Sequence, residues 1–338
     1  MTLKTAVVRA CLAVMAFATI LLAACGGDGS SAKTPAPPAL RDPAARGPYN
    51  VALTKMTFER PANADGTPRK LETWIWYPTT GTPGDATPVI DAPPATSGGP
   101  FPIVIFSHGN GGQPQFHKYF TEHLASWGFI VAAPPHPGDT SADCSPCGAS
   151  KLVPSARERP ADVTLVLDKL IALKDDPSQP LGKIVDPTRS TLAGHSFGGW
   201  TAIFAAPDGR FNAVVAMAPG APEILLGRGA KITVPTLILG GDKDEIVNPA
   251  GVRRLFDAIP ATTAKTYVSF PEGHHLTFID KCLGCTAALT EERGHELVNR
   301  YTTAFIETYV MKDDRYAHYL TEDVAPEAVI IHDAGAGN

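Results

Sequence analysis

The chain reads Ala193-Gly194-His195-Ser196-Phe197-Gly198-Gly199-Trp200 at the point that decides its fold. Residues 189–193 precede this stretch and predict a short buried strand, and residues 200–206 predict a helix that ends before a proline. Gly-x-Ser-x-Gly between a strand and a helix is the pattern of a nucleophile elbow, in which glycines permit a strained turn that exposes the serine hydroxyl. We therefore expect Ser196 to be a catalytic nucleophile.

The composition is that of a folded protein with a sizeable core. The chain has 338 residues, of which 44% are hydrophobic, an ordinary share for a globular protein. Its formal net charge is −5 at pH 7, so it lacks the basic balance that a nucleic-acid partner requires. We expect no nucleic-acid binding.

Strands and helices alternate along most of the chain. Strands are predicted over residues 51–58, 71–77, 102–106, 129–133, 189–193, 213–217, 234–239 and 265–270, and helices over residues 116–126, 160–173, 200–206 and 290–309. This order predicts an α/β protein whose mostly parallel, twisted sheet has helices on both faces. The two leading strands suit an antiparallel edge, and Pro160 suits the first turn of its helix.

Candidate partners for Ser196 follow two later strands. A serine needs a base and a carboxylate that orients the base, and after a nucleophile elbow the acid precedes the histidine in the chain. Asp242 and Asp244 follow the strand that ends at residue 239, and His274 and His275 follow the strand that ends at residue 270. Ligands bind beyond the carboxyl ends of such strands, so these side chains are expected near Ser196.

The oxyanion of the tetrahedral intermediate needs preformed N–H donors. One expected donor is the backbone N–H of Phe197, directly after the nucleophile, and the other comes from a loop near the start of the sheet. His108-Gly109-Asn110-Gly111-Gly112 follows the strand at residues 102–106, and its glycines allow close approach of the backbone. We take the N–H of Asn110 as the second donor and His108 as structural.

Four motifs together resemble a known superfamily. They are Ser-His-Gly-x-Gly-Gly from residue 107, Ala-Ser-Trp-Gly-Phe-Ile-Val-Ala-Ala-Pro-Pro-His-Pro-Gly from residue 125, Arg-Pro-Ala-Asp-Val from residue 159, and Gly-His-Ser-Phe-Gly-Gly from residue 194. As a set they resemble the α/β-hydrolase superfamily, and within it bacterial dienelactone-hydrolase-like proteins and platelet-activating-factor acetylhydrolases. The resemblance covers roughly Thr54 to Tyr309.

The resemblance implies a single α/β-hydrolase domain that hydrolyses carboxylic esters through an acyl-enzyme, without metal or organic cofactor. Asp244 resembles the acid of Gly-x-x-Asp loops followed by two apolar residues, and His275 fits the superfamily's His-x-x-Phe pattern. The implied triad is therefore Ser196, His275 and Asp244. Dienelactone hydrolases proper use a cysteine nucleophile, so lactone chemistry is not implied. The expected substrate is a small-molecule, lipid or polymer ester.

Four cysteines form two Cys-x-x-Cys pairs, Cys144 with Cys147 and Cys282 with Cys285. In an exported protein such pairs suit structural disulfides, and four cysteines allow three connectivities that the sequence does not distinguish. A zinc site or a redox motif are the alternatives. A non-catalytic, redox-active or metal-binding exported lipoprotein on a hydrolase fold is accordingly the second functional hypothesis.

The N-terminus has the features of an export signal. Basic residues precede an apolar run over residues 10–24, which is too short to span a bilayer and ends at Leu22-Ala23-Ala24-Cys25. The last four residues resemble the lipobox of bacterial lipoproteins, which implies acylation of Cys25 and a lipid anchor in the bacterial cell envelope. We expect a signal peptide over residues 1–24, a flexible tether over 25–48 that is rich in Gly, Ser, Pro and Ala, and the folded domain over 49–338.

Overall fold

The computed structural model describes residues 40–335 apart from residues 64, 82–83, 85–86, 145 and 221. The signal peptide, Cys25 and residues 25–39 of the expected tether lie outside the described residues. The compact folded unit begins at Leu40 rather than at Tyr49. No helix in the described part of the chain is both long enough and apolar enough to cross a membrane.

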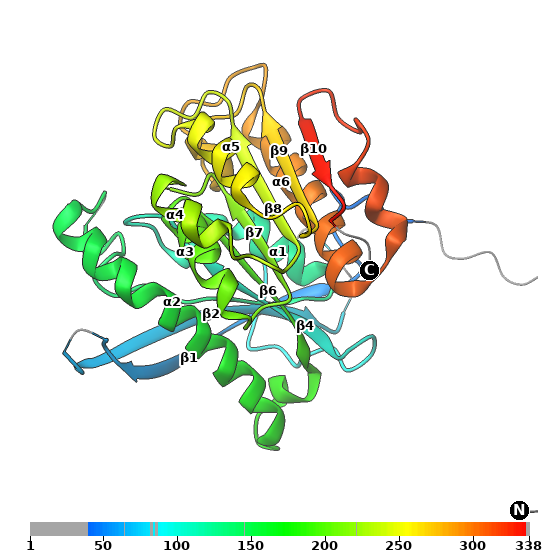
Figure 1. Ribbon diagram of the computed structural model, residues 1–338. Helices are drawn as coiled ribbons and strands as arrows, with labels where there is room; N and C mark the ends of the chain where they lie inside the picture. The colour runs from blue at the N-terminus through cyan, green and yellow to red at the C-terminus, as the bar shows by residue number, and fades with distance from the viewer. Residues whose placement is uncertain are drawn as a thin grey trace, which may run out of the picture. The chain divides into compact units, whose positions relative to one another are not determined.

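The described residues form one ten-stranded sheet flanked by helices (Figure 1). The strands are β1 Asn50–Pro61, β2 Pro68–Thr79, β3 Val89–Ile90, β4 Phe101–Ser107, β5 Ile130–Ala133, β6 Val185–His195, β7 Ala213–Met217, β8 Thr236–Gly241, β9 Lys265–Phe270 and β10 Val329–Asp333. The helices are α1 Lys118–Ser126, α2 Ala149–Ala172, α3 Phe197–Ala205, α4 Pro222–Gly229, α5 Pro249–Ala258 and α6 Glu291–Ile306. The alternation predicted from the sequence is confirmed.

The strand order is β10-β9-β8-β7-β6-β4-β5-β2-β1-β3. Strands β5, β4, β6, β7, β8 and β9 run parallel to one another, and β2 joins β5 in antiparallel pairing. β1 and β2 form the expected antiparallel edge, and β10 pairs antiparallel with β9 at the other edge. The chain passes from β4 to its neighbour β5 and then crosses through α2 to β6 on the other side of β4. The strand order reverses at this point of the sheet, where a ligand site is expected.

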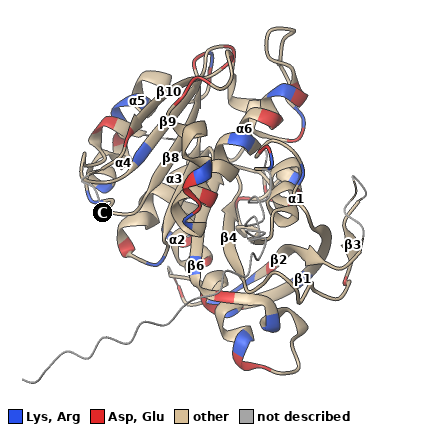
Figure 2. Ribbon diagram, turned by 90° about the vertical axis from the view of Figure 1, so that its right-hand side faces the viewer, with Lys and Arg blue, Asp and Glu red and all other residues tan. Residues whose placement is uncertain are grey.

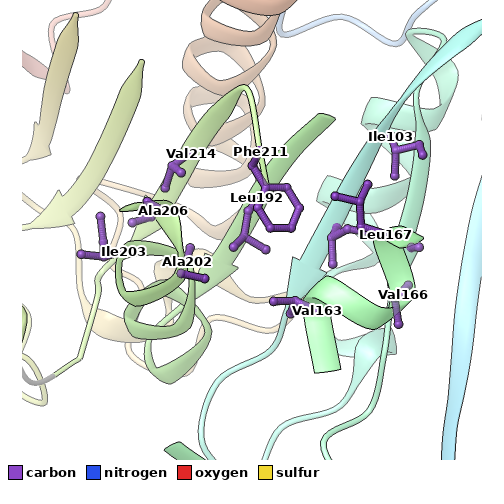
Figure 3. Packing of buried hydrophobic residues seen from close by; sticks show 14 of the residues in the cluster. Ile103, Val163, Val166, Leu167, Leu192, Ala202, Ile203, Ala206, Phe211 and Val214 are labelled. Carbon is purple, nitrogen blue, oxygen red and sulfur yellow. The ribbon is translucent and has the colours of Figure 1, made fainter. Parts of the chain in front are cut away.

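Two apolar layers enclose the sheet, one on each face. In β4 the side chains of Ile103 and Ile105 enter one layer and those of Val104 and Phe106 enter the other, because successive strand residues point to opposite faces. Helices α2 to α5 cover the first face, and α1 and α6 cover the second. Figure 3 shows the first layer, where residues of α2 and α3 meet strand residues; those labelled are Ile103, Val163, Val166, Leu167, Leu192, Ala202, Ile203, Ala206, Phe211 and Val214.

Charged side chains lie mainly on the helices and connecting loops, while strand β4 carries none (Figure 2). Strands β5, β7 and β8 likewise contain no Asp, Glu, Lys or Arg. Strands that are covered on both faces are continuously apolar, because burial of an unpaired charge in such a layer is strongly unfavourable.

Helix α2 differs from its prediction. It begins at Ala149, so Pro154 and Pro160 lie inside it and Pro160 does not occupy its first turn. Residues on the buried face of α2, among them Ser155 and Asp162, form hydrogen bonds to the loop that follows β5. These contacts hold the helix through positions where proline removes an N–H donor. Residues 149–156, which precede the predicted helix, are its first two turns.

The segment at residues 40–48, expected to be tether, packs against the end of α1. Gly47 donates its N–H to the hydroxyl of Ser126 at 2.8 Å, and the indole N–H of Trp127 donates to the carbonyl of Ala45 at 2.9 Å. A Cβ atom on Gly47 would lie 2.2 Å from the carbonyl oxygen of Ser126, so glycine permits this close approach. Amino-acid composition alone does not reveal that residues 40–48 pack against the folded domain.

Candidate active site

Ser196 occupies a strained turn between β6 and α3. Its backbone angles are φ 56° and ψ −116°, a region that residues other than glycine rarely adopt and that costs on the order of 1–3 kcal/mol. Its N–H donates to the carbonyl of Met217 at 2.8 Å, and its carbonyl accepts from the N–H of Gly220 at 3.0 Å. These bonds to the segment around the end of β7 hold the turn in place.

Two glycines around Ser196 make this turn possible. A Cβ atom on Gly194 would lie 2.3 Å from the carbonyl of Gly198, and one on Gly198 would lie 1.8 Å from the carbonyl oxygen of Ser107. Helix α3 therefore begins against the backbone of β4. Its first N–H, that of Phe197, has no partner within the helix because the first turn of any helix leaves its donors free.

Ser196, His275 and Asp244 form one chain of hydrogen bonds. The hydroxyl of Ser196 lies 2.9 Å from Nε2 of His275, and Nδ1 of His275 lies 2.7 Å from Oδ2 of Asp244. The other oxygen of Asp244 accepts the N–H groups of Ile246 at 2.9 Å and Val247 at 2.7 Å. Because the carboxylate can only accept a hydrogen bond, the proton of His275 is assigned to Nδ1. Nε2 can then accept the proton of the serine.

The alternative acid and base lie elsewhere. Asp242 accepts a hydrogen bond from the hydroxyl of Ser269. Nδ1 of His274 lies 3.4 Å from a carboxylate oxygen of Glu245, and its backbone N–H donates to Thr277. His275 begins the short 3-10 helix His275–Phe278 after β9, while His274 caps it. The geometry thus brings Asp244 and His275, not their neighbours, to Ser196.

His195 supports His275, a contact that the sequence did not indicate. The side chain of His195 is buried, and its Nε2 lies 3.1 Å from the carbonyl oxygen of His275. The two imidazole rings pack with centroids 4.8 Å apart. Burial holds the pKa of His195 well below its usual range, so the ring is neutral and donates Nε2–H to that carbonyl. The only feature of the sequence that could have indicated this contact is the position of His195 directly before Ser196.

The loop after β4 lies directly against the nucleophile. A Cβ atom on Gly109 would be 3.3 Å from the Cβ of Ser196. The side chain of Asn110 forms two bonds with the backbone of Cys147, donating to its carbonyl at 3.0 Å and accepting its N–H at 3.2 Å. Asn110 and Phe197 both border the pocket that contains Ser196. The side chain of Asn110 is therefore engaged away from any oxyanion, and only its backbone N–H is available for that role.

The cysteines pair within each motif. Cys144 is bonded to Cys147 and Cys282 to Cys285, with Cα atoms 4.9 and 5.5 Å apart. The structure thus selects one of the three connectivities left open by the sequence, and each disulfide closes a short local loop. Within the described ranges, no group of three or more His, Cys, Asp or Glu side chains is arranged to hold a metal ion.

Ser196 opens into a pocket of about 1160 Å³. One wall is formed by α2, including Leu152 and Leu165, and the other by the aromatic residues Phe197, Trp200 and Phe204 of α3. Trp200 stacks on Phe204 with ring centroids 4.7 Å apart. The rim carries three apolar side chains that are more than half exposed, those of Val153, Ile224 and Ile246. An apolar pocket beside Ser196 suits an apolar ligand.

Comparison with known proteins identifies the family. The PETase family, described as PET hydrolase-like, matches residues 27–333. The chain belongs to the PET hydrolase-like family. It is 26% identical to the cutinase est1 of Thermobifida alba over 221 residues, which are 64% of this chain and 63% of the relative. It is 25% identical to cutinase 2 of Thermobifida cellulosilytica over 221 residues, which are 64% of this chain and 71% of the relative.

This PET hydrolase-like protein is also similar to an animal enzyme. It is 22% identical over 288 residues to the platelet-activating factor acetylhydrolase of Cavia porcellus, covering 70% of this chain and 65% of that protein. The chain thus spans less than two thirds of the length of several of these relatives. Its fold is the α/β-hydrolase fold, as the motif resemblance implied.

Proposed function

We propose that this PET hydrolase-like protein is a serine carboxylic-ester hydrolase that works through an acyl-enzyme. The observation that carries the proposal is the hydrogen-bonded chain from Ser196 through His275 to Asp244, which ends in a large apolar pocket. A serine is a weak nucleophile until a base removes its proton, and this arrangement supplies both the base and the group that orients it. The names of its relatives, cutinases and an acetylhydrolase, agree with ester hydrolysis.

The steps follow from the geometry. The hydroxyl oxygen of Ser196 attacks the ester carbonyl carbon while Nε2 of His275 takes the proton. The N–H groups of Asn110 and Phe197 hold the carbonyl oxygen as it becomes negative. The intermediate then expels the alcohol, which receives the proton from His275, and leaves Ser196 acylated. A water molecule, deprotonated by His275, attacks the acyl-enzyme; the bond to Ser196 breaks, His275 returns the proton to the Ser196 oxygen, and the acid is released.

The test is hydrolysis of p-nitrophenyl esters of increasing acyl length by the wild-type chain and by Ser196→Ala. Wild-type turnover that is lost by at least about 10³-fold in Ser196→Ala supports the mechanism. His274→Ala is the matched control, because it removes the neighbouring imidazole without touching Ser196. Activity that survives Ser196→Ala overturns the proposed nucleophile. A fluorophosphonate probe that labels wild type and spares Ser196→Ala gives the same answer without choosing a substrate.

We further propose that the chain is exported and anchored through acylated Cys25. The support is the signal-like segment before Leu22-Ala23-Ala24-Cys25 and a family match that starts at residue 27, two residues after that cysteine. Labelling with a fatty-acid analogue in a bacterial host tests this. The label should attach to the wild-type chain and be absent from Cys25→Ser. Equal labelling of both would refute lipidation at this position.

A further inference from the structure

A buried polar network lies behind the loop that follows β4. It joins three of the four motifs that the sequence singled out, at Ser107-His108-Gly109, His136 and Arg159-Pro160-Ala161-Asp162. Arg159 lies at its centre and its side chain has no exposed surface. The mechanism proposed above assigns no task to Arg159.

Arg159 bonds to two successive carbonyl groups of that loop. Its Nη1 donates to the carbonyl oxygen of His108 at 2.6 Å, and its Nη2 donates to the carbonyl oxygen of Gly109 at 3.2 Å. Nη2 also bonds to a carboxylate oxygen of Asp139 at 2.8 Å, and the other oxygen of Asp139 accepts the N–H of Gly111 at 2.9 Å. One buried ion pair thus holds the loop at three backbone positions.

The carbonyl of Gly109 accepts two further hydrogen bonds. The N–H of Gly112 donates to it at 3.1 Å, and Nδ1 of His108 lies 2.8 Å from it. Nε2 of His108 accepts the N–H of His136 at 3.2 Å, so the proton of the neutral ring is on Nδ1. Burial holds the pKa of His108 well below its usual range, in agreement with a neutral ring.

The direction of this carbonyl determines the direction of a neighbouring N–H. The C=O of Gly109 and the N–H of Asn110 belong to one planar trans peptide, in which they point in opposite directions. When Arg159 draws the carbonyl into the interior, the N–H of Asn110 is turned outward toward the pocket. A hydrogen bond from a charged guanidinium also polarises the peptide, which makes its N–H a stronger donor.

The ring of Phe197, whose backbone N–H is the other expected donor, also contacts Arg159. The Cζ atom of Arg159 lies 4.4 Å from the centroid of the Phe197 ring, within the range of a cation–π contact. Burial lowers the pKa of Arg159 to about 10 while Asp139 opposes that change, so the guanidinium remains charged at neutral pH.

We propose that Arg159 is a positioning residue for the oxyanion hole, which aligns the Asn110 and Phe197 N–H groups by holding the Gly109 carbonyl and packing on the Phe197 ring. The inference rests on the proposed ester hydrolysis and deepens it. If Arg159 acted on stability alone, its replacement would lower the folded fraction, as would the replacement of another arginine of the network, without a specific effect on kcat. A positioning role affects stabilisation of the transition state, and therefore kcat rather than KM.

The test compares Arg159→Lys and Arg159→Met with Arg69→Met. Arg69 belongs to the same network, but its guanidinium bonds to Asp162 and to the carbonyl of Pro137 and not to the loop after β4. For both Arg159 variants we expect kcat to fall about 10- to 1000-fold with KM within about twofold, because misaligned donors lose up to the roughly 10²- to 10³-fold that removal of an oxyanion donor costs. Arg69→Met should keep kcat within about twofold of wild type.

A transition-state analogue supplies an independent readout. Phenylboronic acid forms a tetrahedral adduct with a catalytic serine, so its inhibition constant should rise in the Arg159 variants by about the factor by which kcat/KM falls. In wild type, its binding should shift the amide proton resonances of both Asn110 and Phe197. This second measurement needs no variant, so an unmoved Asn110 amide would refute the proposal even if both Arg159 variants failed to fold.

Several outcomes would overturn the proposal. They are kcat in a folded Arg159 variant equal to that of Arg69→Met, a loss confined to KM, or a wild-type Asn110 amide unmoved by the boronate. A wild-type chain that neither hydrolyses esters nor reacts with fluorophosphonate would instead refute the proposed function itself. The two failures are therefore distinguishable.

Discussion

Asp244 performs two tasks through its two oxygens. One oxygen orients His275, and the other accepts two backbone N–H groups of its own loop, so the carboxylate is held by bonds that are independent of the histidine. Asp242, two residues earlier, is bonded to Ser269 instead. At the residue scale, the two carboxylates are clearly distinguished, because only that of Asp244 bonds to His275.

We expect Asp244→Asn to lower kcat by about 10³- to 10⁴-fold, because an amide at this position favours the wrong tautomer of His275. The fold should persist, since the amide oxygen still accepts from the loop. Asp242→Asn is the matched control and should keep kcat within about threefold. Steady-state kinetics of both variants on one p-nitrophenyl ester provide the measurement. The reverse pattern would assign the acid to Asp242.

A second residue-scale prediction concerns pH and stability. Burial raises the pKa of Glu307 to about 7, and the carboxylate of Asp313 adds to the rise. Between its ordinary pKa of about 4.5 and 7, the folded state binds a proton that the unfolded state has lost, so the free energy of unfolding decreases as pH rises. The full loss above pH 7 is at most about 3 kcal/mol.

Glu307→Gln should remove this dependence, because a neutral amide cannot titrate. The free energy of unfolding in urea should therefore be higher for the variant than for wild type at pH 8, and the difference should shrink at pH 5. Glu322→Gln, at an exposed position, is the control and should follow wild type at both pH values. A stability difference that is independent of pH would contradict the assignment.

At the scale of elements, the site depends on how closely α3 approaches β4. Gly198 lies in the first turn of α3, where a Cβ atom would come within 1.8 Å of the carbonyl oxygen of Ser107. Contact with a backbone oxygen cannot be relieved by a rotamer change, so either the helix or the strand must move. Both elements position residues of the candidate site, because Ser196 directly precedes α3 and the loop with Gly109 and Asn110 follows β4.

Gly198→Ala should therefore destabilise the protein by about 3 kcal/mol or more and abolish turnover. Gly227→Ala in α4 is the matched control, since its Cβ would meet no atom within 4 Å. In a helix this control exchange stabilises by about 0.5–1 kcal/mol. Thermal unfolding monitored by circular dichroism would compare the two variants. Similar shifts for both would show that the close approach is relaxed at little cost.

At the scale of the whole molecule, the folded unit includes residues that composition assigns to a tether. Pro43, Ala45 and Gly47 provide backbone partners for His123, Trp127 and Ser126. Two of these side chains, those of His123 and Ser126, are buried. Removal of the segment would break these three hydrogen bonds, although Nε2 of His123 would keep Thr303 and the hydroxyl of Ser126 would keep the carbonyl of His123. Each lost bond costs about 0.5–1.5 kcal/mol.

We expect a chain that begins at Tyr49 to be less stable than one that begins at Leu40, by about 2–4 kcal/mol for the three lost hydrogen bonds and the lost packing. Urea unfolding of both forms provides the measurement. A form with residues 40–48 retained but Gly47→Ala serves as a second probe, because the added Cβ clashes with the carbonyl of Ser126. Equal midpoints for the forms beginning at Leu40 and at Tyr49 would show that the segment does not contribute.

The sequence by itself predicted the α/β class, the parallel sheet and the elements that carry the site. Strands β7 and β9 match their predicted bounds, because a buried strand between turn residues is a local apolar signal. Helices α4 and α5 and strand β10 escaped prediction, as did the first half of α2, where prolines gave a misleading local signal. Gly-x-Ser-x-Gly pointed to Ser196 because the turn it forms is encoded locally by glycine.

Only the tertiary structure decided what depends on contacts between distant segments. The motif resemblance favoured Asp244 and His275 over Asp242 and His274, and the packing of their loops places the favoured two in hydrogen-bond contact with each other and with Ser196. The tertiary structure paired the cysteines within their motifs, and it joined Arg159 to a loop 50 residues earlier in the chain. Side-chain direction at a loop is determined by the elements packed around it, and one sequence carries no local signal of that packing.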